Sequence, residues 1–222
     1  MYKYKSLTGD GLLHSLDMVV NERLYLSVCD RMNDPREGGF SVVEQSEIIK
    51  SGNQKDIETL CKLKIKIDGT RFVSFSGRID NHLLWAHYAG EFARIAFKYE
   101  FPNTSDIIEI CQIRYGDQPR IDLKTAEDLI KDNVGVYTQG MLLSKSNAWS
   151  YEDEYRLFLK NSDSSYLSKI KPKAIILGGR GHRYDDVFTQ ICRKYEIIIG
   201  YLLPKNGDLL EVFFPDEKKS PN

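Results

Sequence analysis

The segment Trp149–Leu159 constrains the fold of this chain most strongly, because charged residues give way to an apolar run within it. Glu152, Glu154 and Arg156 are spaced two residues apart. Successive side chains of a β-strand point to opposite faces, so this spacing predicts a strand with three charges on one face. Burying like charges this close is costly unless the arginine or a ligand compensates them. The pattern favours a functional site, and the structural alternative is a charged edge strand that prevents aggregation.

Composition predicts one domain that is large enough to bury a core. The chain has 222 residues, 41% of them hydrophobic and 28% charged, and no repeat or linker divides it. We expect a single catalytic-like domain over residues 1–214 and a disordered tail over residues 215–222. The formal net charge of −1 indicates no general nucleic-acid or membrane surface. Without an apolar leader or spanning segment, the expected location is cytoplasmic, with no membrane partner.

The four cysteines lack the spacing of a metal site or a disulfide framework. They are scattered along the chain at Cys29, Cys61, Cys111 and Cys192. We expect small buried hydrophobic side chains in a reducing compartment, and no metal.

Hydrophobic periodicity predicts strands and helices along the whole chain. Strands are expected at 2–4, 23–28, 71–77, 93–99, 107–115, 173–178, 197–203 and 209–214, and helices at 12–21, 80–90, 123–143 and 184–195. Residues 42–63 predict two surface helices, although residues 62–67 also alternate like a strand. Strands 93–99 and 107–115 are expected to pair antiparallel. The elements predict an α+β single domain with a central, mostly antiparallel and split sheet flanked by helices.

Polar residues suited to a site also occur in the predicted strand 71–77 and helix 80–90. Ser74 and Ser76 fall on one face of the strand, which is also what a half-exposed strand shows. The helix has an Asx N-cap and a glycine stop, and it carries His87 close to Trp85 and Tyr88. His87 is either a hydrogen-bonded rim residue or a proton-transfer group.

Two loops have unusual composition. Residues 32–39 concentrate turn residues, and Pro35 restricts Asp34 to extended geometry, so the loop is either a plain connection or part of a site. Residues 176–182 superficially resemble a phosphate loop but lack its lysine and hydroxyl residues. We interpret them as a strand-to-helix turn, whose amides could bind an anion.

Several segments together resemble a bacterial family catalogued as a domain of unknown function, some of whose relatives are abortive-infection phage-resistance proteins. These segments are Tyr2-Lys3-Tyr4, Leu24–Ser27, Asn33–Glu37, Phe72–Ser76, Leu84–Ala89 and Trp149–Arg156. Their order is similar to that of the motifs of ADP-ribosyltransferases. In that superfamily an early strand supplies a histidine or arginine, a middle strand a Ser-x-Ser or tyrosine, and a late strand a Glu-x-Glu or lone glutamate.

Carried over by position, Ser74-Phe75-Ser76 matches the middle motif and Glu152-Asp153-Glu154 the last, whereas Lys3 stands where arginine or histidine is expected. The resemblance implies an ADP-ribosyltransferase-like fold and displacement of nicotinamide from NAD, which is a substrate. Glu154 would hold the ribose hydroxyl and offset the developing positive charge, and Glu152 would orient or deprotonate the acceptor. Arg156 would keep the carboxylates ionised and engage the pyrophosphate.

The resemblance also implies a binding set and partners. Tyr4, Trp85 or Tyr88 would stack on the ring of the substrate. The residues expected to bind NAD are Lys3, Tyr4, Asn33, Ser74, Ser76, Trp85, His87 and Tyr88. The implied partners are NAD, a macromolecular acceptor that is protein or nucleic acid, and an antitoxin or other defence-system partner.

Two other functions remain open. A non-catalytic nucleotide- or nucleic-acid-binding defence module, such as a sensor or antitoxin, would rely on the basic residues Lys62, Lys64, Lys66 and Arg71, although these also suit a solvated face. A metal-dependent nuclease would use Asp34, Glu37, Glu152 and Glu154. The nuclease would fail in chelator, and the binding module would be indifferent to Glu154→Gln.

Overall fold

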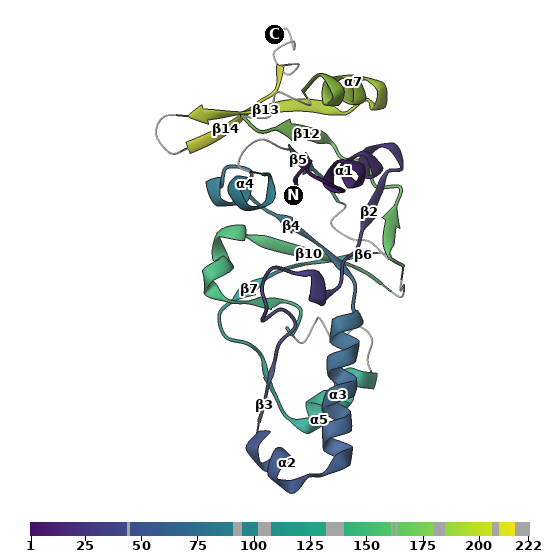
Figure 1. The fold of residues 1–222 in the computed structure, drawn as a ribbon, viewed down its shortest axis with the longest axis vertical. Helices are drawn as coiled ribbons and strands as arrows, with labels where there is room; N and C mark the ends of the chain where they lie inside the picture. The colour runs from purple at the N-terminus through teal and green to yellow at the C-terminus, as the bar shows by residue number, and fades with distance from the viewer. Residues whose placement is uncertain are drawn as a thin grey trace.

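The computed structural model describes residues 1–43, 45–90, 95–101, 108–131, 140–160, 162, 164–179, 185–205 and 209–215. The molecule is elongated, with a large sheet in its upper part and a lobe of helices α2, α3 and α5 at its lower end (Figure 1). In chain order the elements are β1 (Tyr2–Lys5), α1 (Gly11–Val20), β2 (Arg23–Tyr25), the 3-10 helix η1 (Cys29–Arg31), β3 (Ser41–Val42), α2 (Gln45–Ser51), α3 (Gln54–Gly69), β4 (Phe72–Ser76), α4 (His82–Tyr88), β5 (Ile95–Lys98), β6 (Ile108–Gln112), β7 (Arg114–Tyr115), β8 (Arg120–Ile121), α5 (Leu123–Lys131), β9 (Ser144–Lys145), the 3-10 helix η2 (Asn147–Glu152), β10 (Glu154–Leu159), β11 (Tyr166–Ser168), β12 (Ala174–Leu177), α7 (Asp185–Tyr195), β13 (Ile198–Lys205) and β14 (Leu209–Phe213).

The central sheet has eight strands in the order β14-β13-β12-β5-β1-β4-β10-β6. Its neighbours are antiparallel, except that β12 and β13 are parallel. The predicted α+β class, with a mainly antiparallel central sheet flanked by helices, is confirmed. The predicted pairing of strands 93–99 and 107–115 is wrong, because β5 lies between β1 and β12 while β6 pairs with β10.

The sheet opens between β1 and β4. Along β1, each residue from Tyr2 to Lys5 has a register partner on β5, whereas the register of β1 with β4 is the pair of Tyr2 and Ser76. At the other end of β4, Phe72 exchanges both backbone hydrogen bonds with Ser27. Alternate residues of an antiparallel strand present their backbone groups to the same edge, so Ser74 faces the opening between these two attachment points.

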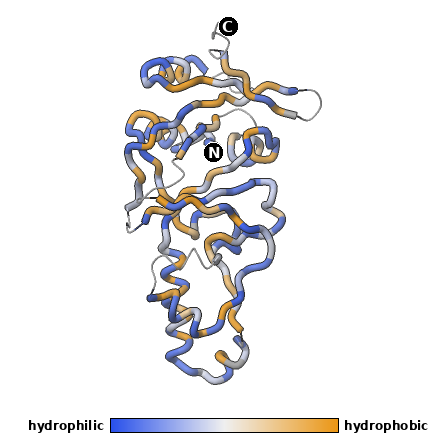
Figure 2. The backbone as a smooth tube through the Cα atoms, turned by 180° about the vertical axis from the view of Figure 1, so that it is seen from behind, coloured by the Kyte–Doolittle hydropathy of each residue, from blue (hydrophilic) through white to orange (hydrophobic). Residues whose placement is uncertain are grey.

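Strict alternation divides the apolar residues between the two faces of the sheet. Odd-numbered residues of β5 and β12, such as Phe97 and Ile175, pack with α1 and α7 on one face. Even-numbered residues, such as Ala96 and Ile176, pack with α4 on the other. The backbone is coloured mostly as hydrophobic where the central strands cross the molecule (Figure 2). A shift of register by one residue would move the apolar side chains of a strand to the opposite face. Because both faces are buried, the registers of the strands beside the opening are fixed.

Helices α3 and α5 pack together in the lower lobe around a separate group of buried residues that includes Leu63, Ile67 and Leu129. Helix α3 runs through Gly69, so residues 62–67 are helical and the strand alternative is wrong. The Asn53 side chain caps this helix by accepting a hydrogen bond from Lys55 N.

Other boundaries differ from prediction. The expected helix 123–143 ends at Lys131 as far as it is described, residues 132–139 lie outside the described residues, and 140–143 form turns. The strand expected at 23–28 ends at Tyr25 and continues only as the bridge at Ser27. The strand expected at 107–115 is divided into β6 and β7, which lie in different sheets. The remaining predicted helices and the strands at 71–77, 173–178, 197–203 and 209–214 are confirmed.

Two predicted features lie largely outside the described residues: most of the tail 215–222 and the turn residues 180–182. The four cysteines are unpaired, and Cys29 and Cys192 are buried as expected, but Cys61 is exposed on α3. Among the described residues, no helix is both long and apolar enough to cross a membrane.

Candidate functional site

A cavity of about 270 Å³ lies where β1 and β4 diverge. Strands β1, β4 and β10, the segment 25–33 and helix α4 contribute to its wall. The lining includes eight of the residues that the sequence singles out, namely Lys3, Tyr4, Asn33, Ser74, Ser76, Tyr88, Glu152 and Glu154. Residues that are far apart in the chain therefore meet at the opening in the sheet.

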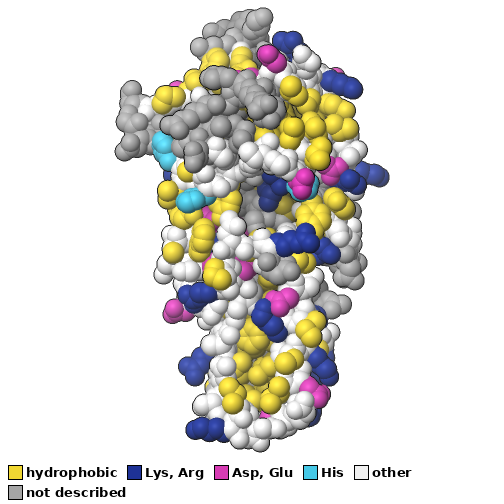
Figure 3. Space-filling view, in the orientation of Figure 1, with side chains coloured by type: hydrophobic (Ala, Val, Ile, Leu, Met, Phe, Trp, Pro, Cys, Tyr) yellow, Lys and Arg dark blue, Asp and Glu magenta, His cyan; other side chains and the backbone are white. Residues whose placement is uncertain are grey.

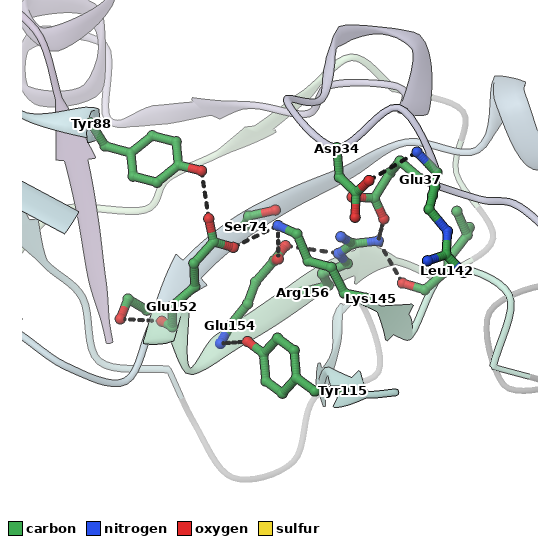
Figure 4. Close-up of polar contacts among 12 residues, drawn as sticks. Asp34, Glu37, Ser74, Tyr88, Tyr115, Leu142, Lys145, Glu152, Glu154 and Arg156 are labelled. Carbon is green, nitrogen blue, oxygen red and sulfur yellow. Dashed lines mark hydrogen bonds and ion pairs between the residues drawn. The ribbon is translucent and has the colours of Figure 1, made fainter. Parts of the chain in front are cut away.

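Two carboxylates in the cavity share one ammonium group. The Nζ atom of Lys145 lies 2.5 Å from Oε2 of Glu152 and 2.9 Å from Oε2 of Glu154 (Figure 4). Tyr88 donates a hydrogen bond of 2.5 Å to Oε1 of Glu152, and the Lys145 ammonium lies 5.0 Å from the centre of the Trp149 ring. The three charged side chains are at most 9% exposed, so the cluster forms in a water-poor environment.

Glu152 does not lie on the strand that its spacing predicts. It ends the 3-10 helix η2, and Asp153, with φ of 43°, turns the chain in a left-handed conformation before β10 begins at Glu154. The Ser76 hydroxyl donates a hydrogen bond of 2.6 Å to the Glu152 carbonyl, and Tyr115 accepts one of 2.7 Å from Glu154 N. These bonds hold two carboxylates from different elements beside the same lysine.

Arg156 lies behind Glu154 and does not line the cavity. Its side chain is 0% exposed; its Nε donates to Oε1 of Glu154 at 2.8 Å, and its Nη1 donates to the Leu142 carbonyl. The same Nη1 lies 2.6 Å from Oε1 of Glu37, and the guanidinium covers the Phe72 ring at 4.4 Å. The expectation that Arg156 keeps Glu154 ionised fits this geometry, whereas a contact with pyrophosphate does not, because the guanidinium is enclosed.

The two glutamates have pKa values that are shifted in opposite directions. Burial acts to raise the pKa of Glu154, but the charges of Arg156 and Lys145 outweigh it and lower this pKa to about 2. Burial also raises the pKa of Glu152, and there Lys145 and Tyr88 offset it only in part. Environments that separate two carboxyl pKa values assign the groups to different tasks. Glu154 is a permanent anion at neutral pH, and Glu152 is the better proton acceptor.

Lys3 and Ser74 meet at the unpaired edge of β4. The Lys3 ammonium donates a hydrogen bond of 2.8 Å to the Ser74 carbonyl, which takes the place of a ladder bond from β1. Burial and the neighbouring Lys5 lower the pKa of Lys3 to about 7, although Glu154 opposes the shift. The buried hydroxyl of Ser74 lies in the same cavity and interacts with the Glu154 carboxylate, which helps to lower the pKa of Glu154. It is a polar group that a ligand in the cavity can also reach.

The aromatic candidates divide into cavity and core residues. Tyr4 and Tyr88 line the cavity, and Tyr4 donates to the Arg78 carbonyl at 2.7 Å. Trp85 is 0% exposed, packs edge-on against Tyr4 and donates to the Ile79 carbonyl, so it supports the wall and cannot stack on a ligand. His87 is exposed and lies near Tyr88 and Tyr151 outside the cavity lining.

Lys145 is the site residue that the sequence reasoning missed. It stands seven residues before Glu152 and nine before Glu154, at the end of an expected helix that in fact leads into β9. Its signal was a lysine placed two residues after the apolar run Met141–Leu143. The cavity also has Arg31 in its lining, with Nη1 donating to the Tyr25 hydroxyl at 3.1 Å.

The acidic residues of the proposed nuclease are engaged in other contacts. Asp34 accepts a hydrogen bond from Arg36 N, and Glu37 pairs with Arg156. Asp34 and Glu37 line a second, smaller cavity together with Lys64 and Asp68. Within the described ranges, no group of three or more His, Cys, Asp or Glu side chains is arranged to hold a metal ion.

Comparison with known proteins found no match among protein-family models, curated proteins or solved structures. The chemistry of this site is therefore inferred from its own geometry.

Proposed function

We propose that this protein is an ADP-ribosyltransferase-like enzyme that uses NAD as a substrate and has an ADP-ribosyltransferase-like fold. The observation that carries the proposal is the pair of carboxylates with opposite pKa shifts at the opening of a sheet. The three strands that border this site, β1, β4 and β10, hold the three segments whose order resembles that of the transferase motifs.

The charge balance of the cluster favours a cationic ligand. Glu37, Glu152 and Glu154 share two cations, Lys145 and Arg156, and the ion pairs join all five groups. One carboxyl group therefore lacks a full counterion. A substrate that develops positive charge would supply it, and preorganised charges are most effective in a site that excludes water.

In the proposed reaction the bond between the ribose C1′ and the nicotinamide nitrogen breaks, and both bonding electrons leave with neutral nicotinamide. Glu154 remains ionised and offsets the positive charge that develops on the sugar. The acceptor oxygen or nitrogen then bonds to C1′, and Glu152 takes the proton that the acceptor loses. Tyr88 and Lys145 keep the Glu152 carboxylate oriented through their contacts with its two oxygens.

The remaining wall of the cavity suits the same substrate. The ring of Tyr88 or Tyr4 offers an apolar surface for nicotinamide, and the Ser74 hydroxyl beside Glu154 offers a polar contact to the ribose or carboxamide. A charged Lys3 would repel the cationic ring of NAD, whereas its lowered pKa leaves much of it neutral near pH 7.

The rival binding module finds less support. Lys66 donates to the carbonyls of Leu129 and Ile130, and Lys64 pairs with Asp68, so both lysines have partners within the lower lobe. Acidic and basic side chains are interspersed over the described part of the face in Figure 3. A nucleic-acid surface would instead gather basic groups on one face.

The cellular role is proposed from the resemblance: a cytoplasmic toxin or anti-phage defence protein that modifies a protein or nucleic acid, with an antitoxin or other defence partner restraining it. These parts of the proposal rest on the resemblance of the six sequence segments to the bacterial family alone.

Release of nicotinamide from NAD by the purified chain tests the proposal, with and without cell lysate as a source of acceptors. Glu154→Gln should lower the rate by about 100- to 1000-fold, the usual effect of removing one electrostatic stabiliser. Glu211→Gln is the matched control, because Glu211 lies on β14 in an exposed pair with Lys205. Equal rates in the two variants, or neither release nor NAD binding by the native chain, would refute the assignment.

A further inference from the structure

Lys3 differs from the other two cations of the site in having no carboxylate partner. Lys145 and Arg156 each form two ion pairs, whereas no ion pair within the described part of the chain includes Lys3. The Lys3 ammonium donates to the Ser74 carbonyl and lies 6.0 Å from the centre of the Phe75 ring. Lys3 is therefore an amine of the cavity that interacts with Glu154 through space but forms no direct ion pair among the described residues.

The strand position of Lys3 explains this environment. Its register partner on β5 is Phe97, on the sheet face that α1 and α7 cover, and the residue is only partly exposed. The side chain reaches the edge of β4, where it meets the Ser74 carbonyl. One hydrogen bond satisfies one of the three donors of an ammonium and one of the two donors of a neutral amine, so the charged form is the less completely satisfied of the two.

Several charged groups act on this amine. Burial is the largest influence and, together with Lys5 on the same strand, lowers the Lys3 pKa to about 7, while Glu154 on β10 opposes the change. Arg31, Lys145 and Glu152 are the other charged groups in the lining of the cavity. The free base, which carries the nucleophilic lone pair, is thus abundant near neutral pH.

We propose that Lys3 is a nucleophilic amine that forms an imine with aldehydes entering the cavity, an activity separate from the proposed glycosyl transfer. The lone pair of Nζ attacks the carbonyl carbon, and the Glu152 carboxylate carries one proton from the nitrogen to the carbonyl oxygen, which gives the carbinolamine. The second nitrogen proton then passes to the hydroxyl group, which leaves as water while the nitrogen lone pair forms the C=N bond. No oxidant or reductant is needed.

The ligand class is an aldehyde with an anionic group, such as the open-chain form of a sugar phosphate. Arg31 is exposed, lines the same cavity as Lys3 and is held by the Tyr25 hydroxyl at 3.1 Å. A guanidinium in this position pairs with a phosphate bidentately, while the aldehyde reaches the amine.

Reductive trapping tests the proposal on the full chain. Pyridoxal 5′-phosphate, or the smaller glycolaldehyde phosphate, is added between pH 6 and pH 10; borohydride then reduces any imine, and mass spectrometry maps the labels. We expect Lys3 to be labelled faster than the exposed Lys62, with a rate that reaches half its maximum near pH 7. Fragmentation of the N-terminal peptide separates a label on Lys3 from one on the Met1 amine.

Variants complete the test. Lys3→Arg keeps a donor for the Ser74 carbonyl but cannot form an imine, so the fast label should disappear, whereas Lys5→Met should retain the label and move its half-maximal rate to higher pH, because Lys5 lowers the Lys3 pKa. Arg31→Met should slow labelling by the phosphorylated aldehyde about tenfold, the effect of one charge-assisted hydrogen bond, and leave labelling by pyridoxal unchanged. Labelling of native Lys3 that is no faster than that of Lys62 with both probes, or that rises only near pH 10, would overturn the proposal. Nicotinamide release, measured separately, does not depend on this result.

Discussion

The Nζ atom of Lys145 lies 2.9 Å from Oε2 of Glu154, and both side chains are almost completely withdrawn from solvent. The lysine comes from the two-residue strand β9, which pairs with β7 and not with the central sheet. A side chain from outside the sheet therefore balances the charges that the sheet brings together.

Replacing Lys145 by methionine should destabilise the protein strongly. The change leaves Glu152 and Glu154 buried without their shared cation, and breaking a buried pair from one side costs about 3–5 kcal/mol. Urea denaturation of Lys145→Met measures the loss. Lys205→Met is the control, because its partner Glu211 is exposed and such pairs contribute only about 0–1 kcal/mol. Equal losses in the two variants would contradict the assigned role of Lys145.

The stability contributed by Glu154 should disappear in acid. Its pKa is lowered from 4.5 to about 2 on folding, so this contribution is complete above pH 4.5 and is lost as the pH falls toward 2. The Glu154→Gln variant has no carboxyl group to titrate at this position. The difference in unfolding free energy between the native chain and the variant should therefore become smaller as the pH falls from 4.5 toward 2. Denaturation series between pH 7 and pH 3 check this. A gap that stays constant would show that Glu154 is not preferentially ionised in the folded state.

Removing the Tyr88 hydroxyl should make Glu152 a carboxylate that is harder to ionise. Tyr88 donates to Oε1 of Glu152 and lowers its pKa, so Tyr88→Phe raises that pKa further above its ordinary value. If Glu152 accepts the proton of the acceptor, the acid limb of the pH profile of nicotinamide release moves to higher pH. Tyr166→Phe, on strand β11 outside the cavity lining, keeps the ring beside Tyr25 and should leave the profile in place. An unmoved profile in Tyr88→Phe would exclude Glu152 as the base.

Trp85→Phe should affect stability and leave NAD binding unchanged. The substitution removes the donor to the partly buried Ile79 carbonyl, a hydrogen bond that contributes about 0.5–1.5 kcal/mol, and it opens space beside Tyr4. Thermal unfolding and calorimetric titration with NAD measure the two effects. Weaker NAD binding without a loss of stability would mean that the indole contacts the ligand after all.

Much of the site was predictable because strand periodicity is a local property. The alternation in residues 71–77 placed Ser74 and Ser76 on one face, and the register of β4 with β10 sets them opposite Arg156 and Glu154. The adjacency of β1, β4 and β10 was not predictable from periodicity, since these strands are joined by long connections. The error over β5 and β6 has the same origin: neighbours in sequence often pair, but here β5 pairs with β1 and β12.

The remaining errors arose where packing overrode a local signal. Trp85 lies beside a histidine and a tyrosine in sequence, yet its helix turns it into the core while His87 points outward. Lys145 follows an apolar segment that suggested a continuing helix, and only its two carboxylate partners reveal its role. Glu152 reaches the cluster through a 3-10 helix, a route that a spacing of two residues does not indicate.

Asp153, in the left-handed conformation, is the one residue between Glu152 and Glu154, so its backbone angles set the distance between the two acidic residues. Two hydrogen bonds hold Asp153 in place: Gly77 N donates to its carbonyl at 2.9 Å, and Gln112 Nε2 donates to its side chain at 3.1 Å. A Cβ atom on Gly77 would lie 2.2 Å from Oδ2 of Asp153. A methyl group one residue beyond the end of β4 would thus displace the Asp153 side chain that Gln112 holds, without altering Glu152 or Glu154.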